Sequence, residues 1–193
     1  MDRRSGIPLS LLGLLVLLAI GASALALSEA PRSADLAVHN AVGETLSASS
    51  FRAVTSTHAT TNGQSYAQGE RISYNSPSKV VVSVSTSTSP HGVRIVLTHA
   101  QESTFFSHFR QLSTTKGWVS HGRYFTIVQP ASSLVPPSAA KLVSGSVVTD
   151  VYVTDGYLTS VVQHIDATEG GQTSVQIGRF DFLEIGGRPV STP

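Results

Sequence analysis

The chain has 193 residues, enough for one domain beside an N-terminal targeting segment. Its 13 Lys and Arg residues balance 12 Asp and Glu residues without forming a basic cluster, which argues against a nucleic-acid-binding surface. The absence of cysteine excludes disulfides and thiolate chemistry. Charged residues make up only 13% of the chain, below the level of about a quarter that is usual in soluble domains.

Residues 7–27 form an uncharged, largely apolar run that directly follows Arg3 and Arg4. This pattern predicts a signal peptide cleaved after Ala24 or Ala26, or an uncleaved anchor, because ~20 apolar residues are enough to span a bilayer. Under both interpretations the basic terminus stays in the cytoplasm and the rest of the chain lies outside. We therefore expect a signal peptide or membrane anchor over residues 1–27, a linker over 28–33 and one folded domain over 34–193. The domain is expected in the cell envelope, anchored by its N-terminal helix or secreted after cleavage.

Ser33 is a candidate cap for a helix over residues 34–49, in which Val38, Val42 and Leu46 recur at four-residue spacing. From residue 51 the period changes to two, which predicts strands over residues 51–60 and 64–75 with a turn at Asn62-Gly63. A further strand is expected over residues 79–89, with alternate valines on one face.

Alternation continues through residues 93–100, where Val93, Ile95 and Leu97 fall on one side, and predicts another strand. Residues 103–109 are expected to form the next strand and residues 123–129 one more, with a loop over 116–118. Residues 130–146 interrupt the sheet. Because a helix tolerates proline in its first turn, two prolines at 136–137 favour a short helix over residues 138–143.

A late hairpin is predicted around Asp155-Gly156, which suits a two-residue turn with both residues at positive φ. In that register Val153 faces Leu158. The same register pairs Val151 with Ser160 and Thr149 with Val162. Turns at residues 170–171 and 186–187 bound a final strand over residues 172–185.

Candidate catalytic and metal-binding residues do not form a recognisable constellation. Four of the seven histidines lie in one stretch, but without the spacing of a ligand pair: His91, His99, His108 and His121. No G-x-S-x-G motif exposes a nucleophile, and His164 and Asp166 are interpreted as polar groups at a strand edge. We therefore expect neither a cofactor, nor a metal, nor enzymatic activity.

The positions of strand ends and turns along residues 34–193 resemble those of the LolA-like and LppX/LprG-like envelope proteins of bacteria, especially the actinobacterial members. The resemblance is carried by the order of an early helix, a meander, a late hairpin and an aromatic last strand. The matching residues are Gly69, Tyr74 and Pro77, then Asp155 and Gly156, then Phe180 and Phe182, and finally Pro189, Val190 and Pro193.

The resemblance implies an α+β fold in which a strongly curved antiparallel sheet, a half-barrel, carries an N-terminal helix and a short helix on its concave side. In that family the space between sheet and helices is apolar and holds acyl chains. Burial of each methylene is worth ~0.8 kcal/mol, so such a groove competes with a bilayer without any catalytic group. The expected function is extracytoplasmic binding or carriage of a lipid or amphipathic ligand. The apolar lining is expected to comprise Val38, Val42, Leu46, Val82, Val84, Ile95, Leu97, Val151, Val153 and Leu158.

The chain departs from the family pattern at the lipid-attachment site. Lipoprotein members carry a cysteine after the apolar segment, whereas the similar stretch IGAS has Ser23 there. Residues 7–27 must then tether the domain themselves, or the domain is released. The segment between Gln129 and Ser146 is also shorter than in larger relatives, which implies a reduced lid. The alternative function is a structural or interaction domain whose core is filled by side chains and whose sheet contacts an envelope protein.

Overall fold

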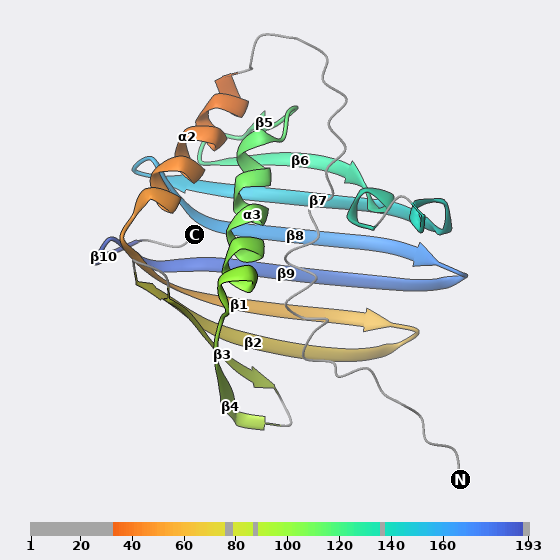
Figure 1. Cartoon of the computed structure of the whole chain (residues 1–193). Helices are drawn as coiled ribbons and strands as arrows, with labels where there is room; N and C mark the ends of the chain where they lie inside the picture. Colours follow the sequence, from red (N-terminus) through yellow and green to blue (C-terminus); the bar gives the residue numbers. More distant parts are fainter. Residues whose placement is uncertain (1–32, 76–78, 87–88, 136–137, 191–193) are drawn as a thin grey trace.

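The computed structural model describes residues 33–75, 79–86, 89–135 and 138–190. Two α-helices lie on one large sheet, so the fold belongs to the α+β class (Figure 1). The helices are α2 (Ser33–Ser47) and α3 (His99–Thr114), and the 3-10 turns are η1 (Ala131–Leu134) and η2 (Ala140–Leu142). The strands are β1 (Ser50–Thr61), β2 (Gln64–Asn75), β3 (Lys79–Thr86), β4 (Ser89–Val96), β5 (Val119–Ser120), β6 (Tyr124–Pro130), β7 (Val143–Thr154), β8 (Tyr157–Glu169), β9 (Gln172–Ile185) and β10 (Arg188–Pro189).

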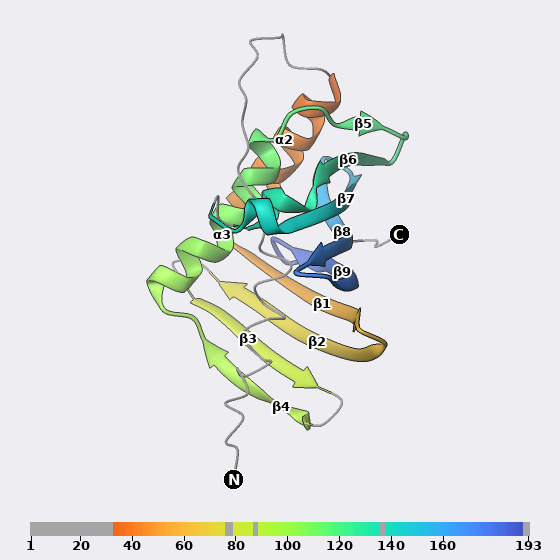
Figure 2. The ribbon, with the colours of Figure 1, turned by 90° about the vertical axis from the view of Figure 1, so that its right-hand side faces the viewer.

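The strands form one antiparallel sheet in the order β4-β3-β2-β1-β9-β8-β7-β6-β5, with β10 paired to β9. The sheet is open because β4 and β5 lie at opposite ends. β9 pairs with both β1 and β8 and so joins an N-terminal meander to a C-terminal one. Figure 2 shows the sheet curving, with α2 and α3 on one side, which we call the inner face. The expected open, curved antiparallel sheet is confirmed.

The predicted first helix, the first hairpin and the last strand are confirmed. α2 begins at Ser33, and its buried stripe includes Val38 and Val42. The turn residues Asn62 and Asp155 adopt φ values of 51° and 53°, in the left-handed region that tight hairpin turns require. β9 covers the whole predicted range of residues 172–185.

Residues 103–109 were expected to form a strand, and this prediction is wrong because they belong to α3. The helix begins with a capping box, in which the Thr98 amide donates to Gln101 Oε1 at 2.9 Å and the Gln101 amide donates to Thr98 Oγ1 at 3.4 Å. Phe105, Phe109 and Leu112 follow at helical spacing and are all buried. The preceding strand β4 therefore ends at Val96, short of the predicted residue 100.

The expected short helix over residues 138–143 is replaced by η2, a single 3-10 turn. The other 3-10 turn, η1, packs on the inner face. Ala131 of η1 contacts Val147 and Ile165 in a small buried cluster. A few residues between β6 and β7 suffice to cover that part of the sheet.

The register of the late hairpin is correct only at its tip. Val153 pairs with Leu158 as predicted, but Val151 pairs with Val161 and Thr149 pairs with Gln163. A β-bulge between Tyr152 and Val153 shifts the register, so the predicted partners Ser160 and Val162 are each displaced by one residue. The bulge decides which β8 side chains reach the inner face.

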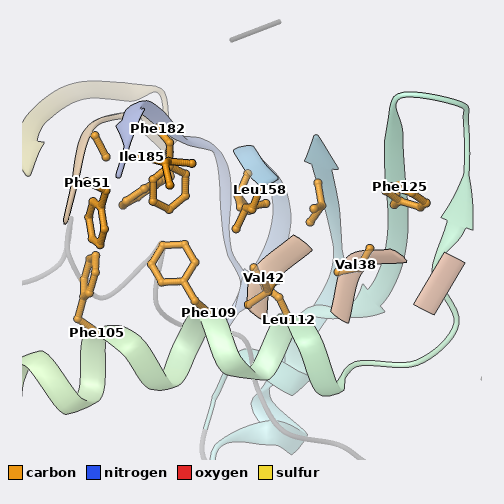
Figure 3. Close-up of a cluster of buried hydrophobic side chains, with 14 of the residues drawn as sticks. Val38, Val42, Phe51, Phe105, Phe109, Leu112, Phe125, Leu158, Phe182 and Ile185 are labelled. Atoms are coloured by element: carbon orange, nitrogen blue, oxygen red, sulfur yellow. The ribbon is translucent and has the colours of Figure 1, made fainter. Parts of the chain in front are cut away.

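The main core lies between the inner face and the two helices (Figure 3). Phe105, Phe109 and Leu112 point from α3 toward the sheet, where they meet Phe51, Phe182 and Leu158. Among the residues that the structure describes, no helix is long and apolar enough to cross a membrane. The predicted signal or anchor over residues 1–27 and nearly all of the predicted linker lie outside them.

Candidate ligand site on the inner face

Most of the predicted apolar lining residues come together in the main core, between the two helices and the sheet. Val38, Val42, Leu97, Val151 and Leu158 are buried in the main core, and Leu46 and Val153 pack against it half-buried. Ile95 is 41% exposed and lies outside this cluster, and the side chains of Val82 and Val84 fall outside the described part of the structure. Beneath α2, side chains therefore occupy the interior, and a ligand-lining role for these residues stays a prediction.

Phenylalanine side chains span the space between α3 and the sheet. Phe109 contacts Phe180 and Phe182, with ring centroids 5.0 and 5.8 Å apart, and Phe51 contacts Phe105 at 6.3 Å. These separations are in the range of favourable aromatic pairs. We call Phe51, Phe105, Phe109, Phe180 and Phe182 the phenylalanine cluster.

Along the strands, next to the phenylalanine cluster, the inner face becomes polar. Directly paired residues on antiparallel strands point to the same face of a sheet. Strands β2, β1, β9, β8 and β7 are successive neighbours in the sheet. Their pairing therefore places one residue from each strand side by side in a row. This inner polar row consists of Gln68, Thr57, Gly178, Gln163 and Thr149. Thr57 and Gly178 are separated by even numbers of residues from Phe51 and Phe180, so the row shares the face of the cluster.

Both ends of the inner polar row carry hydrogen bonds between buried side chains. Gln68 Nε2 donates to Glu70 Oε1 at 2.8 Å, and Gln163 Nε2 donates to Thr149 Oγ1 at 3.3 Å. Gln163 and Thr149 are each 2% exposed. Burial raises the pKa of Glu70, and the hydrogen bond from Gln68 opposes that rise. The inner face thus includes a carboxyl group that favours its neutral form more than an exposed one does.

Within the described part of the structure, two buried amide atoms on the inner face have no hydrogen-bond partner. They are Gln163 Oε1 and Gln176 Nε2, and Gln176 itself is 7% exposed. Gln176 pairs with Ala59 and Ile165, so it lies one row further along the same face and diagonal to Gln163. A buried polar group without a partner costs about 1–3 kcal/mol, so such atoms are informative about binding.

Sequence reasoning missed this part of the site because the bulge in β8 reverses the expected facing of Gln163. A signal was nevertheless present in β9, where Gln176 and Gly178 share the face of Phe180 and Phe182. A glutamine or a glycine that continues a buried aromatic stripe is unusual in a core. The glutamine needs hydrogen-bond partners there, and the glycine has no side chain to fill the space.

The opposite, outer face carries a shallow, open depression of about 380 Å³ near the tip of the first hairpin. His58, Thr60, Val175 and Ile177 line it together with neighbouring residues, and both β9 residues are largely exposed. Its openness offers little burial for a ligand, so we do not favour it as a lipid site.

Buried acids elsewhere in the structure have structural partners. Asp35 Oδ1 accepts hydrogen bonds from the amides of Gly117 and Trp118 at 3.0 and 2.9 Å, and Glu102 Oε1 accepts one from the Val80 amide at 2.8 Å. Within the described ranges, no three His, Asp or Glu side chains are grouped so that they could hold a metal ion.

Comparisons with known proteins do not assign the chain to a family. No protein-family model matches it, and no curated protein matches its sequence significantly. Among solved structures, the crystal structure of LprF from Mycobacterium bovis aligns over 86% of this chain and 98% of that chain, with a TM-score of 0.43 and 13% identity. A match at this TM-score and identity does not establish the family to which the chain belongs.

Proposed function

We propose that this protein is a non-catalytic binding protein that holds a lipid or another amphipathic molecule against the inner face of its sheet. The observation that carries the proposal is the junction of two unlike surfaces on that face. The phenylalanine cluster adjoins the inner polar row. Among the described residues, Gln163 Oε1 in that row and Gln176 Nε2 in the next row have no hydrogen-bond partner. An amphipathic molecule has the same division into an apolar chain and a polar head.

The apolar part of the ligand is assigned to the side of the sheet that α2 and α3 cover. Each methylene withdrawn from water there contributes ~0.8 kcal/mol, so a long chain offsets the cost of leaving a bilayer. α2 lies close against β8, whereas the phenylalanine rings bridge α3 and the sheet (Figure 3). The proposal requires these rings to rotate and α3 to shift, so that a chain can enter the core to which the predicted lining residues Val38, Val42 and Leu97 belong.

An extracytoplasmic location is part of the proposal and rests on the apolar run of residues 7–27 behind Arg3 and Arg4. That run either stays in the membrane as a tether or is removed as a signal peptide. Both arrangements bring the domain close to a source of lipid.

The test is native mass spectrometry of the full chain purified from a bacterial host, together with uptake of a fluorescent fatty acid. We expect co-purified lipid that the fluorescent probe displaces. Gly178→Phe, which places a ring in the middle of the inner polar row, should lower uptake at least about tenfold, a loss of about 1.4 kcal/mol in binding.

The matched control is Ile177→Phe, which adds a ring to the outer face of the same strand and should leave uptake unchanged. Protein that is repeatedly empty and takes up no probe would contradict the proposal. Equal loss in both variants would show that damage to β9, rather than occupation of the inner face, lowers uptake.

The alternative is a structural or interaction domain, and one observation favours it. Val38, Val42, Val151 and Leu158 are at most 1% exposed, so side chains already fill the interior beneath α2. In that case the sheet would contact an envelope protein, and exposed apolar residues such as Val175 and Ile177 are the candidates for the contact. Consistently empty protein in the experiment above is the outcome this alternative predicts.

A further inference from the structure

One position of the inner polar row, Gly178, carries no side chain, and we call this position the gap. Gly178 is buried and pairs with Thr57 on one side and with Gln163 on the other. Adjacent strands are about 4.8 Å apart, so the backbones of Thr57 and Gln163 lie about 10 Å from each other with no side chain between them. This spacing suits a small polar group rather than a bulky one.

Unpaired hydrogen-bonding atoms border this gap. Among the residues that the structure describes, the acceptor Gln163 Oε1, directly opposite Gly178, has no partner. The donor Gln176 Nε2, two residues from Gly178 on β9, has none either. Both belong to residues at least nine-tenths buried. A single hydroxyl group can accept from one amide and donate to the other, and it still fits if the oxygen and nitrogen of either amide exchange places.

The charges of the side chains around the gap favour a neutral polar group over an anionic one. Among the described side chains of the inner polar row and of the two rows beside it there is no Lys or Arg, and the one acid is Glu70. Arg179 of β9 points to the outer face, where its Nε donates to Asp181 Oδ2 at 2.7 Å. A phosphate would therefore lose its hydration without gaining a cation, and Glu70 would repel it when ionised.

We propose that Gln163, Gln176 and the gap at Gly178 form a subsite for a neutral, hydroxyl-bearing headgroup, such as the glycerol or sugar of an uncharged lipid. This inference rests on the proposed function, because it names the class of ligand for the same inner face. The chain of such a lipid extends from the subsite toward the phenylalanine cluster.

The experiment compares four ligands on the full chain kept soluble in amphipol: monolauroylglycerol, methyl laurate, lauroyl lysophosphatidate and glycerol. Monolauroylglycerol and methyl laurate share an acyl chain and differ in free hydroxyl groups. We expect the wild-type chain to bind monolauroylglycerol about tenfold more tightly than methyl laurate, as two additional hydrogen bonds allow. Lysophosphatidate should bind more weakly than monolauroylglycerol.

Gln176→Met keeps the length of the side chain and removes the free donor. It should reduce the preference for monolauroylglycerol to about twofold, the loss of most of one hydrogen bond, while leaving methyl laurate binding unchanged. Gln172→Met, at the exposed start of β9, is the matched control and should keep the full preference. Because both variants retain residues 7–27 and the amphipol, nonspecific uptake by either cancels in the comparison.

The outcomes separate this inference from the proposed function. Equal affinity for methyl laurate and monolauroylglycerol would overturn the subsite and leave lipid binding intact, and lysophosphatidate binding at least as tightly as monolauroylglycerol would overturn its neutral character. Failure of all four ligands to bind would overturn both proposals. Binding of glycerol alone that Gln176→Met abolishes would support the subsite and assign it to a free polyol.

Discussion

At the scale of single residues, a few buried polar side chains fix the helices on the sheet. Thr45 of α2 is fully buried, donates to the Ala41 carbonyl at 2.8 Å and accepts from the Leu158 amide at 2.8 Å. Leu158 lies beside the β-bulge, where the ladder between β7 and β8 is irregular. Thr45 thus supplies to β8 a hydrogen-bond acceptor from another element of the fold.

Thr45→Val should destabilise the protein by about 1–3 kcal/mol, because it leaves the buried Leu158 amide without an acceptor at nearly constant side-chain volume. Thr45→Ser keeps the hydroxyl and should lose much less. Denaturant unfolding of both variants measures the difference. Equal losses in the two variants would show that the methyl group, rather than the hydroxyl, is what matters.

Glu70 makes stability depend on pH. Burial raises its pKa above the ordinary value of 4.5, so the folded state binds the proton more tightly than the unfolded state. The free energy of unfolding should therefore fall as pH rises from about 4.5 through the raised pKa. Glu70→Gln still accepts the hydrogen bond from Gln68, so it should remove this slope and raise stability near neutral pH.

Unfolding in denaturant between about pH 4 and about pH 8 checks this dependence. Glu169→Gln at the exposed end of β8 is the control and should keep the wild-type profile. Parallel pH profiles for wild type and Glu70→Gln would contradict the assignment.

At the scale of elements, the sequence predicts those helices and turns whose formation depends on residues near one another in the chain. α2 follows from the spacing of Val38, Val42 and Leu46, and the tight hairpins follow from Asn62-Gly63 and Asp155-Gly156. α3 was missed because residues 103–109 read as an aromatic strand when the capping box ahead of them is overlooked. The facing of Gln163 could not be predicted, because a bulge leaves no periodic mark in the sequence.

The start of α3 is a direct test of that correction. Thr98→Ala removes the capping hydroxyl and should cost about 1 kcal/mol of stability, whereas Thr98→Ser should cost little. Thermal unfolding followed by circular dichroism measures both. An alanine variant as stable as wild type would mean that Thr98 does not cap α3 in solution.

At the scale of the whole molecule, the family resemblance carried by the order of elements implies an open curved sheet, but the strand order depends on contacts between residues far apart in sequence. β9 lies between β1 and β8, and no periodicity reports that pairing. It is this pairing that brings Thr57, Gly178 and Gln163 into one row and places the row beside the phenylalanine cluster. The candidate site is therefore a property of the assembled sheet, which explains why the sequence indicates apolar lining residues but not their polar neighbours.

The central claim is that an amphipathic molecule occupies the inner face, and photo-crosslinking tests it most directly. A monoacylglycerol with a diazirine at the end of its acyl chain is equilibrated with the full chain and irradiated, and adducts are located by mass spectrometry. We predict adducts on Phe105, Phe109, Phe180 or Phe182, which face one another across the inner side of the sheet. Adducts confined to outer-face residues such as Val175 and Ile177, or no adducts in the folded domain, would contradict the account.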